Sequence, residues 1–227
     1  MPRRSQKSPS RRAQTAPPAA KQPRKRLPSQ VRRLQIMDSA ARLVVEQGFL
    51  PLPIERLARE AGTSKALVYT YFPTQYQLCN ALIEREWQTL ASVGLITASQ
   101  VNDLEQAVTL CGMLYFEHVS RTGPLLQILA ADLYMTGHHN EQHARECASL
   151  RKRLARLIHD ALELPLKEAD AAVDMMTAIP AESGSLVHAK RLEAQLGREL
   201  CRTLLSSSLR ALRTPERLDT LAAQDGA

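Results

Sequence analysis

Apolar side chains recur every three to four residues along most of the chain beyond residue 30, the spacing that places them on one face of an α-helix. The first run covers residues 31–47, and Gly48 follows it as a helix C-cap would. Prolines and short polar residues then divide the chain into helices at 53–61, 64–72 and 74–87. We expect Thr63 or Ser64 to cap the third helix and Thr74 to cap the fourth.

The rest of the chain shows the same periodicity and no strand pattern. A helix at 102–120 is apolar nearly all round between residues 107 and 116, which is typical of a central buried helix. Further helices are expected at 124–134, 140–162, 166–179 and 192–213, with a loop containing Pro180, Ser183, Gly184 and Ser185 between the last two. The pattern predicts an all-α protein with about nine helices.

Short helices separated by glycine-containing turns are typical of a helix-turn-helix. The N-terminal region contains Gly48-Phe49, Leu57-Ala58, Ala61-Gly62-Thr63-Ser64, Val68-Tyr69 and Tyr71-Phe72, in this order and at fixed spacing. Because of these residues and their spacing, segment 31–82 resembles the DNA-binding region of the tetracycline-repressor (TetR/AcrR) family. The resemblance implies a helix-turn-helix DNA-binding domain at 31–76 and a helical ligand-binding and dimerisation domain at 77–227.

The start of the third helix supplies the chemistry of base and phosphate recognition. A recognition helix enters the major groove with its N-terminal residues near the base edges. Here that end offers hydroxyl groups, the ammonium of Lys65 and the methyl of Ala66, which suit phosphate, guanine and thymine respectively. Tyr69 and Tyr71 either bind phosphate or pack half-buried, and the resemblance favours DNA contact. The predicted DNA-binding residues are Arg56, Thr63, Ser64, Lys65, Ala66, Tyr69, Tyr71 and Gln75.

Two positions depart from the family pattern. The chain has Leu52-Pro53 where the family often has a Thr or Ser that caps the second helix and touches phosphate. Gln75 replaces a frequent Lys, so a phosphate contact from this position lacks charge. We therefore expect the folded domains to hold phosphates more weakly than is usual in the family.

Positive charge is concentrated at the N-terminus. The chain has a net charge of +7, and residues 1–30 contain nine Lys and Arg, six of the 13 prolines and no acidic or aromatic residue. This composition predicts a disordered basic arm. The arm either follows DNA phosphates or enters a minor groove, or it is a solvated segment serving solubility or processing. Residues 23–26 would also pass as a nuclear signal in a eukaryotic protein.

The resemblance implies a small-molecule pocket beyond residue 95. Asp132 would share a helical face with Leu125 and Leu129, so its carboxylate either meets the ligand or pairs with an arginine or a helix N-terminus. The predicted ligand-binding residues are Met113, Phe116, His118, Leu129, Asp132, Tyr134 and Met175. Their types do not identify the ligand.

A leucine stripe in the last helix predicts dimerisation. Leu192, Leu196, Leu200 and Leu204 recur every four residues and need cover from the body or from a second chain. A second chain is the favoured cover, because two-fold dimers read two half-sites of DNA. The family resemblance implies a four-helix bundle formed by the last two helices of each copy.

Other chemistry has weaker support. Cys79, Cys111, Cys147 and Cys201 lie far apart without a CxxC motif, which favours reduced thiols over a zinc site. His139, His143 and Cys147 would share a helix face, but they are stretched for one ion, so a solvated, charged face is the preferred interpretation. No phosphate-binding or nucleophile motif is present. We expect no catalytic residue, metal or cofactor.

The sequence therefore predicts a ligand-responsive transcriptional regulator that acts as a repressor. It would bind a palindromic operator as a homodimer and be released by a small molecule. A basic N-terminus without an apolar segment, and no apolar run of about 18 residues, favour a cytoplasmic protein associated with the nucleoid. The alternatives are an architectural DNA-binding protein without a ligand and a metal-binding helical enzyme.

Overall fold

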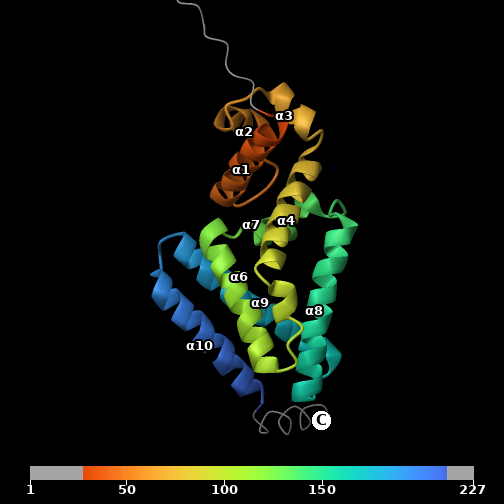
Figure 1. The fold of residues 1–227 in the computed structure, drawn as a ribbon, viewed down its shortest axis with the longest axis vertical. Coiled ribbons are helices and arrows are strands. Elements are labelled where there is room, and N and C mark those ends of the chain that lie inside the picture. Colours follow the sequence, from red (N-terminus) through yellow and green to blue (C-terminus); the bar gives the residue numbers. More distant parts are fainter. Residues whose placement is uncertain (1–27, 214–227) are drawn as a thin grey trace, which may run out of the picture.

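The structure, a computed structural model, describes residues 28–213 and is all-helical over that range, which confirms the predicted fold class. Residues 1–27, most of the predicted basic arm, lie outside it. Between residues 28 and 213 the chain forms ten α-helices and one 3₁₀ helix, where the sequence predicted about nine helices. In chain order (Figure 1) they are α1 (Ser29–Gln47), α2 (Ile54–Glu60), α3 (Lys65–Tyr71), α4 (Gln75–Ser92), α5 (Leu95–Ala98), α6 (Leu104–Thr122), α7 (Leu125–Ala131), η1 (Leu133–Met135), α8 (Glu141–Leu162), α9 (Leu166–His188) and α10 (Ala194–Leu212).

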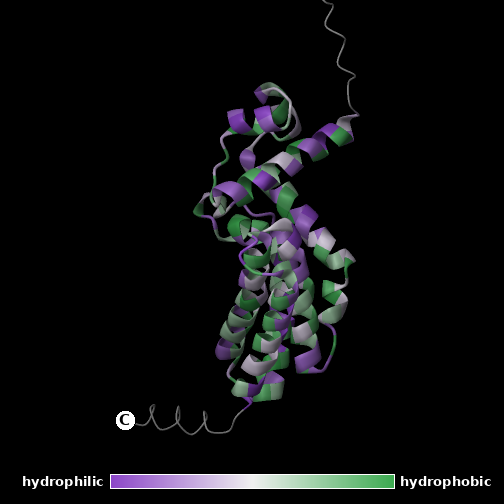
Figure 2. Ribbon diagram, turned by 90° about the vertical axis from the view of Figure 1, so that its left-hand side faces the viewer, coloured by the Kyte–Doolittle hydropathy of each residue, from purple (hydrophilic) through white to green (hydrophobic). Residues whose placement is uncertain are grey.

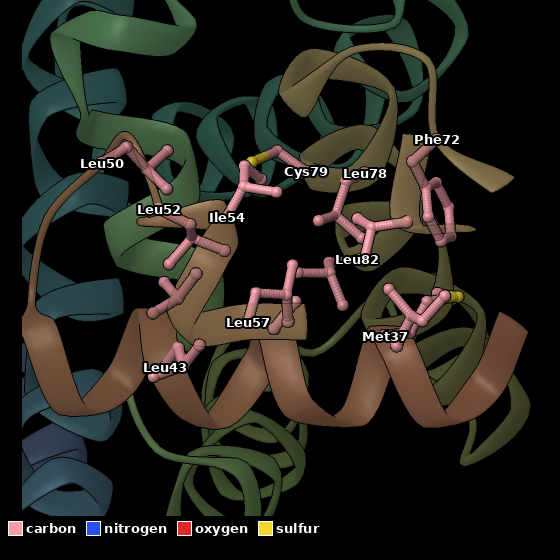
Figure 3. Close-up of a cluster of buried hydrophobic side chains, with 14 of the residues drawn as sticks. Met37, Leu43, Leu50, Leu52, Ile54, Leu57, Phe72, Leu78, Cys79 and Leu82 are labelled. Carbon is pink, nitrogen blue, oxygen red and sulfur yellow. The ribbon is translucent and has the colours of Figure 1, made fainter. Parts of the chain in front are cut away.

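Helices α1, α2 and α3 form a compact unit at one end of an elongated molecule, and α4 leads from this unit into a bundle of α6, α8, α9 and α10 (Figure 1). Figure 3 shows the core of the unit, where Leu43 of α1, Leu57 of α2 and Phe72 meet Leu78 and Leu82 of α4. Helix α7 adds two more fully buried leucines, Leu125 and Leu129. Side chains beyond residue 76 therefore complete the core of the first three helices.

The expected caps of the first helices are confirmed. Gly48 ends α1 in the left-handed conformation at φ 79°, which glycine adopts without strain. The Ser64 hydroxyl accepts a hydrogen bond from the Leu67 amide at 3.2 Å, and the Thr74 hydroxyl accepts one from Gln77 at 3.2 Å. These caps satisfy amides that the first turn of a helix leaves unpaired.

The bundle is organised around the contact between α6 and α9. A Cβ atom on Gly184 would lie 2.7 Å from Val119 Cβ and 3.0 Å from the Phe116 carbonyl oxygen, so the two helices approach too closely for a side chain. The predicted loop at 180–185 is wrong, because α9 continues through Pro180 to His188. Proline opposes a helix interior, but here Pro180 and Gly184 are buried on the side of α9 that the bundle covers. Tertiary packing has overridden the local preference.

The helix expected at 124–134 also ends early. Helix α7 stops at Ala131, and Asp132 has extended backbone angles of φ −71° and ψ 128°. Its carboxylate accepts hydrogen bonds from the Leu50 amide at 2.9 Å and the Tyr134 amide at 2.9 Å. Asp132 therefore does not share a helical face with Leu125 and Leu129. It anchors the loop before α2 instead.

The last helix begins two residues later than expected. Glu193 caps α10, and Leu192 lies before it, half-buried, facing the position of Gly197. Hydrophobic and hydrophilic residues alternate along the helices, as amphipathic packing around shared cores requires (Figure 2). None of the helices between residues 28 and 213 has the length and apolar character needed to span a membrane.

Candidate nucleic-acid interface

Helices α2 and α3 form a helix-turn-helix. The Thr63 amide donates a hydrogen bond to the Ala58 carbonyl at 2.9 Å, and Gly62 turns the chain at φ 60°. Buried Val68, with Phe72 directly after α3, holds one side of α3 against the unit. The opposite side and the N-terminal end of α3 face solvent, so this end is free to enter a DNA groove.

The structure brings most of the predicted DNA-binding residues to this surface. Ser64, Lys65 and Ala66 are exposed at the start of α3, and Thr63 is half-buried beside them. The two tyrosines separate. Tyr69 is 40% exposed on the α3 surface, whereas Tyr71 packs partly against the core of the unit.

The two predicted cationic contacts are held by acids. Lys65 Nζ pairs with Glu55 of α2, and Arg56 pairs with Glu46 at 2.6 Å and with Glu60 at 2.8 Å. The hydrogen bond with Glu55 raises the pKa of Lys65, and those with Glu46 and then Glu60 raise the pKa of Arg56. Exposed pairs of this kind are weak. A DNA phosphate can therefore replace Glu55 beside Lys65, or Glu46 and Glu60 beside Arg56.

Gln75 is engaged within the protein. Its Oε1 accepts a hydrogen bond from the Leu52 amide at 2.8 Å, and its Nε2 donates to the Leu52 carbonyl at 3.0 Å. The side chain thus fixes the loop before α2 to the start of α4, which makes it a positioning residue. The sequence pattern contains no sign of this pairing across 23 positions.

Arg33 is a candidate that sequence reasoning missed. Its guanidinium carbon lies 5.1 Å from the centre of the Phe72 ring, at the end of α3. A cation over an aromatic face is favourable, so Arg33 is held beside the recognition helix. Helical spacing in α1 marks this position only as half-exposed and polar.

A line of charged side chains joins the unit to the bundle. Asp38 of α1 pairs with Arg85 at 2.8 Å, Arg85 with Glu86 at 2.9 Å, and Glu86 with His118 of α6 at 3.2 Å. Glu86 and His118 are only 4% and 2% exposed. Burial alone raises the pKa of Glu86, but the hydrogen bonds and charges of His118 and Arg85 outweigh it, and the pKa is lowered.

The predicted ligand-binding residues lie in several different surroundings. Phe116 and Met113 belong to the core of the bundle, and His118 is bound to Glu86. Leu129 and Tyr134 belong to the core of the N-terminal unit, where the Tyr134 ring stacks on Tyr76 at 4.7 Å between centroids. Asp132 serves the loop described above, and Met175 is 72% exposed. The structure therefore does not gather this set around one cavity.

Two concave sites lie elsewhere. A cleft of about 560 Å³ separates α1 from the bundle and contains Asp38, Arg85 and Glu86 of the charged line. A groove of about 420 Å³ lies along α9, and α6 and α7 contribute its other walls. Its lining residues are Tyr115, Pro124, Gln127, Asp174, Thr177, Ala178, Ala181, Glu182 and Ser185. Both volumes are within the range of about 300–1,000 Å³ typical of small-molecule sites.

The histidine and cysteine face expected on one helix does not form. His139 lies before α8, and buried His143 is bound through Nε2 to Glu84 of α4 at 2.8 Å. The solvated-face interpretation was wrong for His143, because α4 packs over it. Across residues 28–213 we find no group of three or more His, Cys, Asp or Glu side chains arranged to hold a metal.

The N-terminal unit matches a known protein family. Residues 36–82 match the family described as bacterial regulatory proteins, tetR family. This match includes α2 and α3, so the helix-turn-helix of this chain is similar to the one of that family, as the sequence resemblance implied.

Curated relatives match over part of their length. The nucleoid occlusion factor SlmA of Actinobacillus pleuropneumoniae serotype 5b is 35% identical over 99 residues, which cover 43% of this chain and 47% of SlmA. The HTH-type transcriptional activator FasR of Mycolicibacterium smegmatis is 23% identical over 126 residues, covering 56% and 58%. The chain thus matches about half the length of these relatives.

Solved structures share the whole fold. A TetR-like transcriptional regulator from Rhodococcus sp. RHA1 has a TM-score of 0.59 at 20% identity, covering 82% of this chain and 99% of that one. The regulator FadR of Bacillus subtilis, solved with stearoyl-CoA, has a TM-score of 0.55 at 16% identity, covering 77% and 97%. The tetR-like arrangement therefore extends through the bundle.

Proposed function

We propose that this protein is a DNA-binding transcriptional repressor that binds a palindromic operator as a homodimer and is released by a small molecule. The observation that carries the proposal is the exposed start of α3, with Ser64, Lys65 and Ala66, on a tetR-family helix-turn-helix. Lys65 would read a guanine edge, while Ser64 and Tyr69 would bind phosphates. The protein would act in the cytoplasm, on the nucleoid.

The leucine stripe of α10 supports the homodimer. Leu196, Leu200 and Leu204 are 47%, 43% and 50% exposed, at a spacing that puts them on one helix face. Three half-exposed leucines in a row favour burial against a second copy. The second copy would place two α3 helices at successive half-sites, about 34–36 Å apart.

The domain division at residue 76 belongs to the same proposal. Two hydrophobic cores support a division into two parts, one around α1–α4 and one around α6, and the first core also includes Leu125 and Leu129 of α7. Helix α4 crosses between them, with Leu78 in the first core and Leu90 in the second. A ligand that shifts α6 or α9 would act on α4 through the pair between His118 and Glu86, and so change the separation of the two α3 helices. By linkage, such a ligand must bind the DNA-free shape more tightly.

In vitro selection from random double-stranded DNA with the full chain tests the proposal. We expect enrichment of a palindrome, and binding to this palindrome tighter than to a single half-site by about 100-fold or more. Transcription from a promoter overlapping the palindrome should fall when the protein is added. Selection of no sequence, or equal affinity for palindrome and half-site, would contradict the proposal.

The match to SlmA favours a second candidate, an architectural DNA-binding protein without a ligand. Both candidates would bind DNA through α3, which lies in the segment that matches the tetR family. They differ at the groove along α9, which only a ligand-responsive protein needs. An operator affinity that no groove-binding compound changes would favour the architectural candidate. The enzyme alternative has the least support, since the family and fold are those of transcriptional regulators.

A further inference from the structure

The groove along α9 contains a polar group without a partner. Both amide atoms of Gln127, Nε2 and Oε1, are shielded from solvent and have no hydrogen-bond partner within the described residues. A buried amide left unpaired is strongly unfavourable, and native proteins rarely keep one without a function. Gln127 also lines the groove, so a bound molecule with a donor or an acceptor would satisfy the amide once the atoms that shield it move aside.

Apart from two acidic side chains, the other walls of the groove are apolar or neutral. Ala178 and Ala181 leave room along α9, and Tyr115 of α6 contributes an aromatic ring. Burial raises the pKa of Tyr115 to about 12, so its hydroxyl stays neutral. Such walls favour the apolar body of a ligand, while a few polar groups orient it.

The charge of the groove has one sign. None of its nine lining residues is basic, and two of them, Asp174 and Glu182, are acidic. Asp174 accepts a hydrogen bond from Arg151 at 2.7 Å, but Arg151 also binds Asp170 at 2.7 Å, so one cation serves two carboxylates. Within residues 28–213 we find no ion pair to Glu182. The mouth of the groove is therefore negative.

We propose that the groove binds an amphipathic cation, with its apolar body along α9, its cationic head at Glu182 and a polar atom at Gln127. This inference rests on the proposed function, in which the groove is the ligand site. An anionic amphiphile would meet two carboxylates and no lining base. Both acids are exposed, so a cation gains a solvent-screened attraction from each of them.

Three amphiphiles with the same ten-carbon chain test the charge preference: decyltrimethylammonium, decanol and decanoate. Each is titrated into the full chain below its micelle concentration, by calorimetry. We expect decyltrimethylammonium to bind about ten-fold or more tighter than decanoate, with decanol between them. Decanoate binding as tightly as the cation would overturn the cation assignment, yet leave a ligand site in the groove.

Matched variants locate the binding. Glu182→Gln should reduce the preference for the cation about three- to ten-fold, whereas Glu168→Gln, at an exposed acid of α9 outside the groove, should not. Ala181→Leu fills the groove and should abolish binding, while Ala161→Leu, exposed on α8, should leave it unchanged. The site would be overturned if neither Glu182→Gln nor Ala181→Leu changed the affinity for any of the three amphiphiles. It would also be overturned if none of the three bound to the protein.

The test separates this inference from the proposed function. Operator binding is measured on the same proteins without any amphiphile. A chain that binds a palindrome but prefers decanoate would refute only the cation assignment. A chain that binds the cation in the groove but selects no DNA sequence would refute the proposed regulator. If Ala181→Leu weakened dimers of the protein, the groove would hold a second copy of the chain, and the cation assignment would be refuted.

Discussion

The surface proposed to read DNA and the groove proposed to bind a ligand are built in opposite ways. Ser64, Lys65 and Ala66 are consecutive in the sequence, and one turn of α3 presents all of them. The groove takes Tyr115 and Gln127 from α6 and α7, which are neighbours in the sequence, and Glu182 from α9, which lies much further along the chain. The residues of a surface made by one helix end can be predicted from local sequence patterns, whereas the residues of a groove depend on how several helices pack.

The two concave sites also differ in charge. The cleft between α1 and the bundle contains Arg42, Arg85 and Arg121 together with Asp38 and other acids. The charged residues that line the groove along α9 are all acidic. The mixed charges of the cleft pair with one another, as Asp38 and Arg85 do, whereas a single sign of charge attracts a ligand of the opposite sign. The following predictions test this division, beginning with the largest effect.

Breaking the proposed dimer should abolish operator binding. Leu196→Glu with Leu200→Glu places two charges on the exposed stripe of α10, so we expect monomers by sedimentation and at least about 100-fold weaker binding to a palindrome. Helix content by circular dichroism should persist. Arg202→Glu makes the same change in net charge at an exposed position of α10 outside the stripe. If the double variant stays dimeric, the interface lies elsewhere.

Deleting residues 2–27 should weaken binding to any DNA. This segment holds nine cationic residues and no acid, and about three to five of them would neutralise phosphates at once. The plot of log K against log salt should then become flatter by about three to four units. Operator and random DNA should lose similar factors. A loss confined to the operator would show instead that the segment reads sequence.

Filling the close contact between α6 and α9 should destabilise the bundle. Gly184→Val brings side-chain atoms against Val119 and the Phe116 carbonyl, so we expect the free energy of unfolding to fall by about 2–3 kcal/mol. Denaturant titration measures it, and Ala161→Val, at an exposed α8 position, is the control. An unchanged unfolding midpoint would mean that α6 and α9 are less closely packed.

Removing the proposed base contact should affect one base pair. Lys65→Ala should weaken operator binding by about 1–3 kcal/mol and relax the preference at a single position of each half-site. Fluorescence anisotropy with operator variants measures both effects. Equal losses on operator and random DNA would reassign Lys65 to a phosphate.

Replacing the unpaired amide should separate stability from binding. Gln127→Leu removes two buried polar atoms that have no partner, so the free energy of unfolding should rise by about 1 kcal/mol. Affinity for decyltrimethylammonium should fall if the amide orients the ligand. Thermal unfolding and calorimetry on one preparation give both values. A loss of stability would mean that water or a protein group already satisfies Gln127.

Local chemistry let the sequence alone predict much of the N-terminal unit. Gly48, Thr74 and one of Thr63 or Ser64 were expected as caps, and the structure uses Gly48, Thr74 and Ser64, because a cap bonds to an amide or a carbonyl within a few residues. The order and spacing of the tetR-like residues likewise predicted the match of segment 36–82 to the tetR family. Helical periodicity beyond residue 100 was sufficient for the all-α class, since it requires only that each helix bury one face.

Only the tertiary structure decided what distant residues do. Asp132 and Gln75 bind the loop before α2, with partners 82 and 23 positions away. Pro180 stays helical because α9 is packed into the bundle. No local pattern encodes such partners, because they exist only when helices from different parts of the chain meet. The acids and the unpaired amide of the α9 groove come together for the same reason.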